Sequence, residues 1–145
     1  MKIIADTNVL LRAVVGDDAK QSRTAIRAME QAEAVVVTQH ALCELVWVLG
    51  RHYGVSRADI AATIRQLRDT KNITMDRPAV EAGLAVLDAG GDFADGVIAY
   101  EGTWLGGETF ISFDKKAVAS LLSGYKSNRF SCLELSSDSY WESYS

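Results

Sequence analysis

The sequence has few cysteines and no apolar run long enough to cross a membrane. Its two cysteines, Cys43 and Cys132, lie far apart and match no metal-binding spacing. We expect both to be reduced thiols in a cytoplasmic protein, with Cys43 buried. No stretch approaches the roughly 20 consecutive apolar residues of a membrane span. The N-terminus also lacks a secretory pattern, because Asp6 interrupts its apolar run at once.

The chain also lacks an excess of basic residues. It has 15 basic and 19 acidic residues, which gives a formal net charge of -4. A protein that coats nucleic acid by charge alone is normally basic. A polyanionic substrate would therefore need a local basic patch or bound metal cations. If four carboxylates were metal ligands, the remaining balance would be 15 against 15.

Length and composition fit one globular domain, since the 145 residues are 48% apolar. Apolar runs and turn residues predict strands that alternate with helices, which is typical of an α/β fold with a central parallel sheet flanked by helices. The expected strands are 2–5, 34–37, 72–75, 109–113 and 129–135, and the expected helices are 7–15, 19–32, 39–53, 57–68, 78–89, 92–105 and 117–122. We assign 1–135 to the domain and 136–145 to a flexible tail, because the Ser- and Tyr-rich end does not resemble a packed element.

Four acidic residues stand at places where a site could form. Asp6 and Asp114 each follow a predicted strand, and Asp95 lies in the first turn of a predicted helix. The carboxyl ends of strands in an open parallel sheet face one crevice, where ligands bind. Glu44 could reach that crevice from the helix after the second strand. Asp6 and Asp114 would project into that crevice from two strand ends, and spacing alone does not decide whether all four carboxylates meet there.

Each acid also has a purely structural explanation. An Asp between a strand and a helix is a favoured N-cap, which would account for Asp6 and Asp114. Asp92 and Asp95 have capping-box spacing, and an acid in the first turn suits the helix dipole. Glu44 lies opposite the apolar stripe of its helix, where a solvated Glu is common.

Considered together, the four acids favour metal chemistry. Carboxylates in a cluster repel one another unless cations lie among them. Hard oxygen ligands suit Mg²⁺ or Mn²⁺, and such ions activate water to hydrolyse phosphodiesters.

Four segments, MKIIADTNVLLRAVV, ELVWVL, DFADGVIA and TFISFDKKA, resemble the PIN-domain ribonucleases in the order expected for that family. They are most similar to the VapC toxins of bacterial toxin–antitoxin pairs. The resemblance runs from Met1 to about Leu122 and implies a PIN-like three-layer sandwich. It implies that Asp6, Glu44, Asp95 and Asp114 bind Mg²⁺, or Mn²⁺ in its place, and activate water to cut RNA.

The same resemblance implies further roles and partners. The hydroxyl groups of Thr7 and Ser112 would support the metal site by hydrogen bonding, and Asn8 would do similar work. A homodimer, a VapB-like antitoxin and RNA products with 5′-phosphate and 3′-hydroxyl ends are also implied. Gly96 departs from the family, which usually has Ala or another small residue there, and we expect it to weaken its helix slightly.

Several histidine, tryptophan and basic side chains can each be interpreted in two ways. His40 is one turn before Glu44, so it could touch RNA or metal, although a local role is favoured; His52 suits a helix end. Trp47 and Trp104 are expected in the core or an interface, with base stacking as the alternative. Four basic residues are either RNA contacts or solvated: Arg12, Arg51, Lys115 and Lys116.

Three other functions remain open. The DTN segment is similar to phosphatases with an Asp nucleophile, but those normally have a second Asp where this chain has Asn8. The acids could also belong to a non-catalytic module that binds metal or a partner, or to a housekeeping RNA-processing nuclease.

Overall fold

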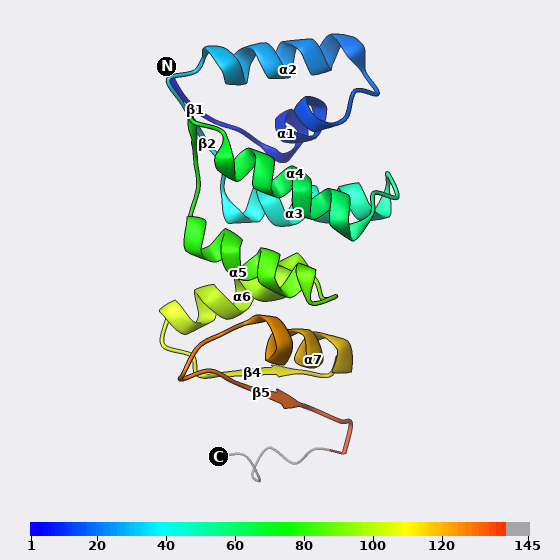
Figure 1. The fold of residues 1–145 in the computed structure, drawn as a ribbon, viewed down its shortest axis with the longest axis vertical. Coiled ribbons are helices and arrows are strands. Elements are labelled where there is room, and N and C mark those ends of the chain that lie inside the picture. Colours follow the sequence, from blue (N-terminus) through cyan, green and yellow to red (C-terminus); the bar gives the residue numbers. More distant parts are fainter. Residues whose placement is uncertain (139–145) are drawn as a thin grey trace. The chain divides into compact units, whose positions relative to one another are not determined.

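The computed structural model describes residues 1–138, in which seven helices and five strands follow one another along the chain (Figure 1). The strands are β1 (Lys2–Ile4), β2 (Ala34–Val36), β3 (Ile73–Thr74), β4 (Thr109–Ser112) and β5 (Ser131–Glu134). The helices are α1 (Thr7–Val14), α2 (Ala19–Gln31), α3 (Gln39–Arg51), α4 (Arg57–Asp69), α5 (Arg77–Asp88), α6 (Phe93–Trp104) and α7 (Lys115–Gly124). The predicted α/β class is confirmed. Most of the predicted tail, residues 139–145, lies outside the described residues.

The chain forms two compact units, Met1–Val80 and Glu81–Ser145, which we describe separately. In the first unit, β1 pairs with β2 and β2 pairs with β3, both in parallel. Ile4 lies opposite Val36, and Val36 lies opposite Thr74. The parallel pairing brings the carboxyl ends of the three strands to one edge, from which α1, α3 and α5 begin.

The core of the first unit includes the apolar stripe of α3. Leu42, Leu45, Val46 and Leu49 are buried, as their spacing predicted. The expected helix 39–53 is two residues too long at its end: α3 ends at Arg51, and the ring of Tyr53 lies at the surface. Cys43 is only half-buried, because it lies off the stripe.

In the second unit, β4 pairs in parallel with β5, and α5, α6 and α7 pack around buried side chains. Phe93 of α6 is fully buried. Gly96 allows α6 to approach α5 closely, since a Cβ atom there would lie 2.3 Å from the carbonyl oxygen of Ala82. The expected weakening of the helix is a local effect of this glycine, and the structure adds a second role, because its missing side chain makes the helix packing possible.

Within residues 1–138, no helix is both long and apolar enough to cross a membrane. This finding agrees with the lack of a long apolar run in the sequence.

Candidate functional site

Asp6 stands between β1 and α1, at the carboxyl edge of the three-stranded sheet. Its backbone is extended, and its carboxylate accepts a hydrogen bond from the backbone N–H of Val9 at 2.9 Å. The side chain is therefore the N-cap of α1, as one interpretation of the sequence predicted. A capping carboxylate can still bind a cation, because the second oxygen and the remaining lone pairs are not used by the cap.

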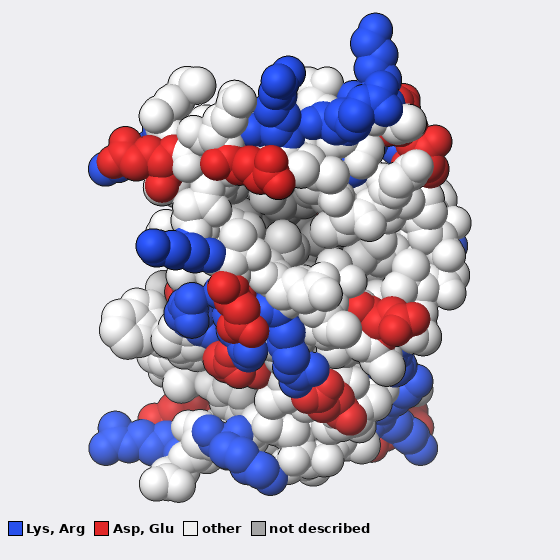
Figure 2. All heavy atoms as spheres, turned by 45° about the horizontal axis from the view of Figure 1, so that its top comes forward, with Lys and Arg blue, Asp and Glu red and all other residues white. Residues whose placement is uncertain are grey.

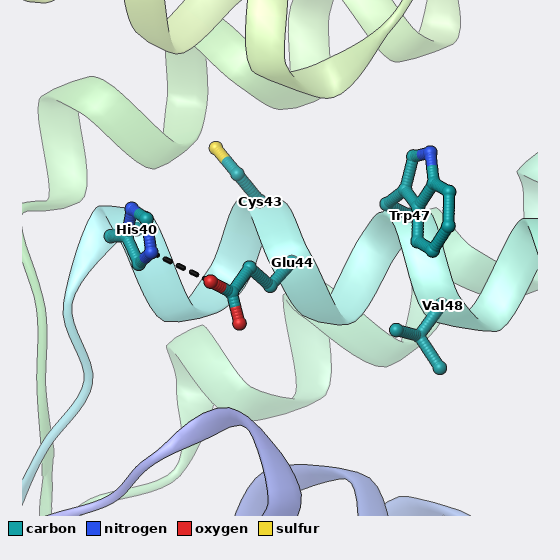
Figure 3. Close-up of a pocket in the computed structure, with 5 residues that line it drawn as sticks. All are labelled: His40, Cys43, Glu44, Trp47 and Val48. Carbon is teal, nitrogen blue, oxygen red and sulfur yellow. Dashed lines mark ion pairs between the residues drawn. The ribbon is translucent and has the colours of Figure 1, made fainter.

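Glu44 lies on α3 and is held by two neighbours. The Thr7 hydroxyl donates to its Oε2 at 2.8 Å, and His40 Nε2 lies 2.6 Å from its Oε1 (Figure 3). The hydrogen bond from Thr7, and after it the one from His40, lowers the pKa of Glu44. The negative charge of Asp6 acts in the opposite direction, so the two carboxylates are electrostatically coupled. The first unit thus brings Asp6, Thr7 and Glu44 together.

Asp95 and Asp114 form a second acidic group in the second unit. Burial raises the pKa of Asp95, and the negative charges of Asp92 and Asp114 raise it further. Asp114 is the N-cap of α7, accepting from the backbone N–H groups of Lys116 at 2.9 Å and Ala117 at 3.3 Å. A cation beside Asp95 would offset both the burial and the repulsion, because each penalises only the ionised form.

The four predicted acids are therefore coupled in two pairs, one in each unit. Each pair offers only hard oxygen ligands, which fit Mg²⁺ or Mn²⁺ and do not suit zinc. Within residues 1–138, no three His, Cys, Asp or Glu side chains form a group that could hold a metal ion. Joining the two pairs into one four-acid site therefore stays a prediction.

Two of the expected supporting residues have other contacts in the structure. The Ser112 hydroxyl accepts from the backbone N–H of Asp114 at 3.0 Å, which fixes the turn between β4 and α7. Asn8 lines a groove between α1 and α2, next to Asp6. Ser112 thus orients a predicted ligand through the backbone, whereas Thr7 contacts one directly.

A pocket of about 430 Å³ lies against α3 beside Glu44. Its lining residues share one side of the helix (Figure 3): His40, Cys43, Glu44, Trp47 and Val48. Trp47 is 56% exposed and packs edge-on against the ring of His52, which caps the end of α3. Trp104 is 82% exposed, so a core position is wrong for both tryptophans.

The predicted RNA-contacting cations have different surroundings. Arg12 Nη1 donates to Asp17 Oδ1 at 2.8 Å, and the Tyr53 hydroxyl donates to Asp17 Oδ2 at 2.8 Å. The hydrogen bond from Tyr53, and after it the one from Arg12, lowers the pKa of Asp17. Lys115 is exposed and lies 3.8 Å from Glu134. Arg12 thus has a structural partner that its sequence position did not indicate.

Asp92 and Asp76 were not among the residues that we expected to form the site. Asp92 caps α6 through the backbone N–H of Ala94 at 3.2 Å, and its charge also acts on Asp95. Asp76 follows β3, accepts from the backbone N–H of Ala79 and contacts Gln39. The signal for Asp76 was present, because it follows a predicted strand as Asp6 does.

Comparison with known protein families matches residues 3–119 to the family described as PIN domain. The match covers nearly all of the first unit and residues 81–119 of the second, and it includes the four predicted acids. Comparison with curated proteins finds no match.

Proposed function

Because the chain belongs to the PIN domain family, whose members are in general nucleases, we propose that it is a Mg²⁺-dependent endoribonuclease and the toxin of a toxin–antitoxin pair. The observation that carries the proposal is the family match, which includes all four predicted acids. Asp6 and Glu44 lie together in the first unit, and Asp95 and Asp114 in the second, so each unit supplies two carboxylates to which a cation can bind.

In this proposal, Asp6, Glu44, Asp95 and Asp114 hold one or two Mg²⁺ ions. When bound, Mg²⁺ lowers the pKa of a water molecule and offsets the charge on the phosphodiester. The Thr7 hydroxyl keeps Glu44 ionised and points its Oε2 in a fixed direction. His40 holds the other oxygen, so the carboxylate has little freedom to rotate.

The capping contacts add to this positioning. Asp6 and Asp114 each use one oxygen on backbone N–H groups, which fixes the orientation of the other. A rigid carboxylate loses little entropy when it binds a cation, so caps at these positions favour binding. The structural and functional interpretations of these two aspartates are therefore compatible.

We propose a homodimer, a cytoplasmic site of action and a VapB-like antitoxin that blocks the acidic residues. The antitoxin would present a basic side chain to them. Its surface would include the helices α3 and α4, where Trp47 leaves an apolar ring exposed.

The activity is tested by incubating the purified, antitoxin-free protein with structured and unstructured RNAs, in Mg²⁺ or in a chelator. We expect cleavage in Mg²⁺ only. Asp6→Asn should abolish it, since Asn retains the cap but not the charge. The matched control is Asp18→Asn, because Asp18 caps α2 in the same way, accepting from Gln21 N–H at 3.0 Å, yet belongs to neither acidic pair.

Three outcomes would contradict the proposal or part of it. Absence of Mg²⁺-dependent cleavage on every RNA would favour the non-catalytic binding module. Equal loss in Asp6→Asn and Asp18→Asn would show that the loss of any capping charge lowers activity, and that Asp6 has no special role in the site. RNA cleavage by a protein that brings no small basic partner with it in its first purification step, before any partner is removed, would favour a housekeeping nuclease over a toxin.

A further inference from the structure

A groove of about 630 Å³ runs between α1 and α2 of the first unit and begins beside Asp6. Its α1 side includes Asn8 and Arg12, and its α2 side includes Lys20, Thr24 and Ala28. From Asp6 to Arg12 the groove follows about 9 Å of helix axis, at 1.5 Å per residue. It therefore leads directly away from one of the predicted metal ligands.

Three basic side chains form a stripe along one side of α2: Lys20 lines the groove, and Arg23 and Arg27 lie next to Lys20 around the helix, outside the residues that line it. Lys20, Arg23 and Arg27 of α2 are separated by three and four residues, so they lie within about 60° of one another around the helix. All three are exposed, and among residues 1–138 none of them forms an ion pair. Figure 2 shows blue side chains gathered over α2, at the top of the view, with red ones on either side.

The cations of the stripe differ from Arg12, the other cation at the groove, in that Arg12 has an ion-pair partner. Arg12 is held by Asp17 at 2.8 Å, so much of its charge is already balanced. Within α2 and its cap, acids stand at the two ends of the stripe, where Asp18 caps the helix and Glu30 lies in its last turn. In a protein of net charge -4, three cations on one helix face that have no ion pair among the described residues form a local basic patch of the kind that a polyanion needs.

We propose that the groove between α1 and α2 holds one strand of RNA, with the phosphates on one side of the scissile bond bound by Lys20, Arg23 and Arg27. This inference rests on the proposed function, because it takes the scissile phosphate to lie at Asp6. The groove lies between two packed helices and so admits a single strand. The cations on its α2 rim face the backbone of that strand, and the polar side chains of Asn8 and Thr24 face its sugars and bases.

The test uses the triple variant Lys20→Gln, Arg23→Gln and Arg27→Gln, made in an Asp6→Asn background so that RNA is not cut. Binding of a fluorescent single-stranded RNA is measured by anisotropy at several salt concentrations. We expect affinity to fall about tenfold at low salt. The slope of log affinity against log salt should become shallower by about 2, because each phosphate contact on a single strand contributes about 0.7.

The matched control removes three other exposed cations, through Lys71→Gln, Lys126→Gln and Arg129→Gln, in the same background. It changes the net charge by the same amount, so its affinity and slope should stay close to those of Asp6→Asn. Equal effects in the two triple variants would mean a bulk charge effect and would overturn the proposal. No effect in the α2 variant would overturn it too.

A single exposed position inside the groove gives a second test. Ala28 lines the groove on α2, so Ala28→Lys should tighten RNA binding and Ala28→Glu should weaken it. Opposite shifts from one position cannot come from unfolding, which would weaken both. Shifts of the same sign, or none, would contradict the proposed path.

Failure of this inference can be told apart from failure of the proposed function. If the parent protein cleaves RNA and the α2 variant, made with Asp6 intact, cleaves equally well at low RNA concentration, only the path is wrong. If the parent binds RNA through α2 but does not cleave it, only the nuclease activity is wrong. Equal, α2-dependent binding of polyglutamate would overturn the RNA assignment and identify an acidic protein segment as the occupant.

Discussion

Gly96 follows Asp95 in α6, where a side chain as small as a methyl group would collide with α5. A Cβ atom at this position would lie 2.3 Å from the carbonyl oxygen of Ala82, whereas ordinary van der Waals contact begins at 3.4 Å. Gly96→Ala therefore requires the two helices to separate locally by about 1.1 Å. The obstacle is backbone, so no rotamer change can relieve it.

Two opposing effects determine how much Gly96→Ala changes the free energy of unfolding. Overpacking of a tight contact typically costs about 1–3 kcal/mol, and a backbone collision belongs at the upper end. Replacing Gly by Ala inside a helix gains about 1 kcal/mol in propensity. We expect Gly96→Ala to lower the free energy of unfolding by about 2 kcal/mol, measured by urea denaturation.

The same helix supplies the control. Gly102 also lies in α6, but no atom lies within 4 Å of its hypothetical Cβ. Gly102→Ala should therefore show only the propensity gain and stabilise the protein by about 1 kcal/mol. Equal stability changes in the two variants would refute the reasoning, since the two sites differ only in the proximity of Ala82.

Three further predictions follow from the titrating groups. Tyr53→Phe removes the hydroxyl that lowers the pKa of Asp17. A lowered pKa contributes stability that is lost as pH falls, so the variant should lose less stability than the parent as pH falls below about 5, as followed by urea midpoints. An unchanged pH dependence would disprove this prediction. Thr7→Val should raise the pKa of Glu44 in an NMR titration, whereas Thr7→Ser should leave it low. Equal pKa values in the two variants would show that the Thr7 hydroxyl does not lower the pKa of Glu44. The pKa of Asp95 is raised, so the stability of the protein falls as pH rises through that pKa. Asp95→Asn should therefore raise the melting temperature at neutral pH without Mg²⁺, and it should abolish cleavage. A lower melting temperature of the variant would contradict this prediction.

Local signals predicted the elements well. Ser56 caps α4 and Asp6 caps α1, as their positions before apolar runs indicated. The stripe of α3 is buried, because apolar residues at helical spacing can be satisfied only by packing. Element ends were less accurate, since α3 stops before Tyr53 and α7 begins two residues earlier than expected. The last turn of a helix depends on contacts with distant residues, such as that of Tyr53 with Asp17.

The sequence by itself determined the class of the fold, the order of its elements and the identity of the predicted acids. Those features depend on residue type and on spacing along the chain, which any reader of the sequence can measure. It could not determine which side chains meet across long separations. Only the tertiary structure placed the Thr7 hydroxyl on Glu44 and the Tyr53 hydroxyl on Asp17. It also left Lys20, Arg23 and Arg27 without ion pairs among residues 1–138.

The difference between what the sequence determines and what the tertiary structure decides also applies to Gly96. From the sequence it was a residue that weakens a helix, because propensity is a local property. In the structure it is the residue that lets α6 touch α5, because the carbonyl oxygen of Ala82 fills the space of a side chain. Close approach between two helices is a property of their packing, so it is decided only when the chain has folded.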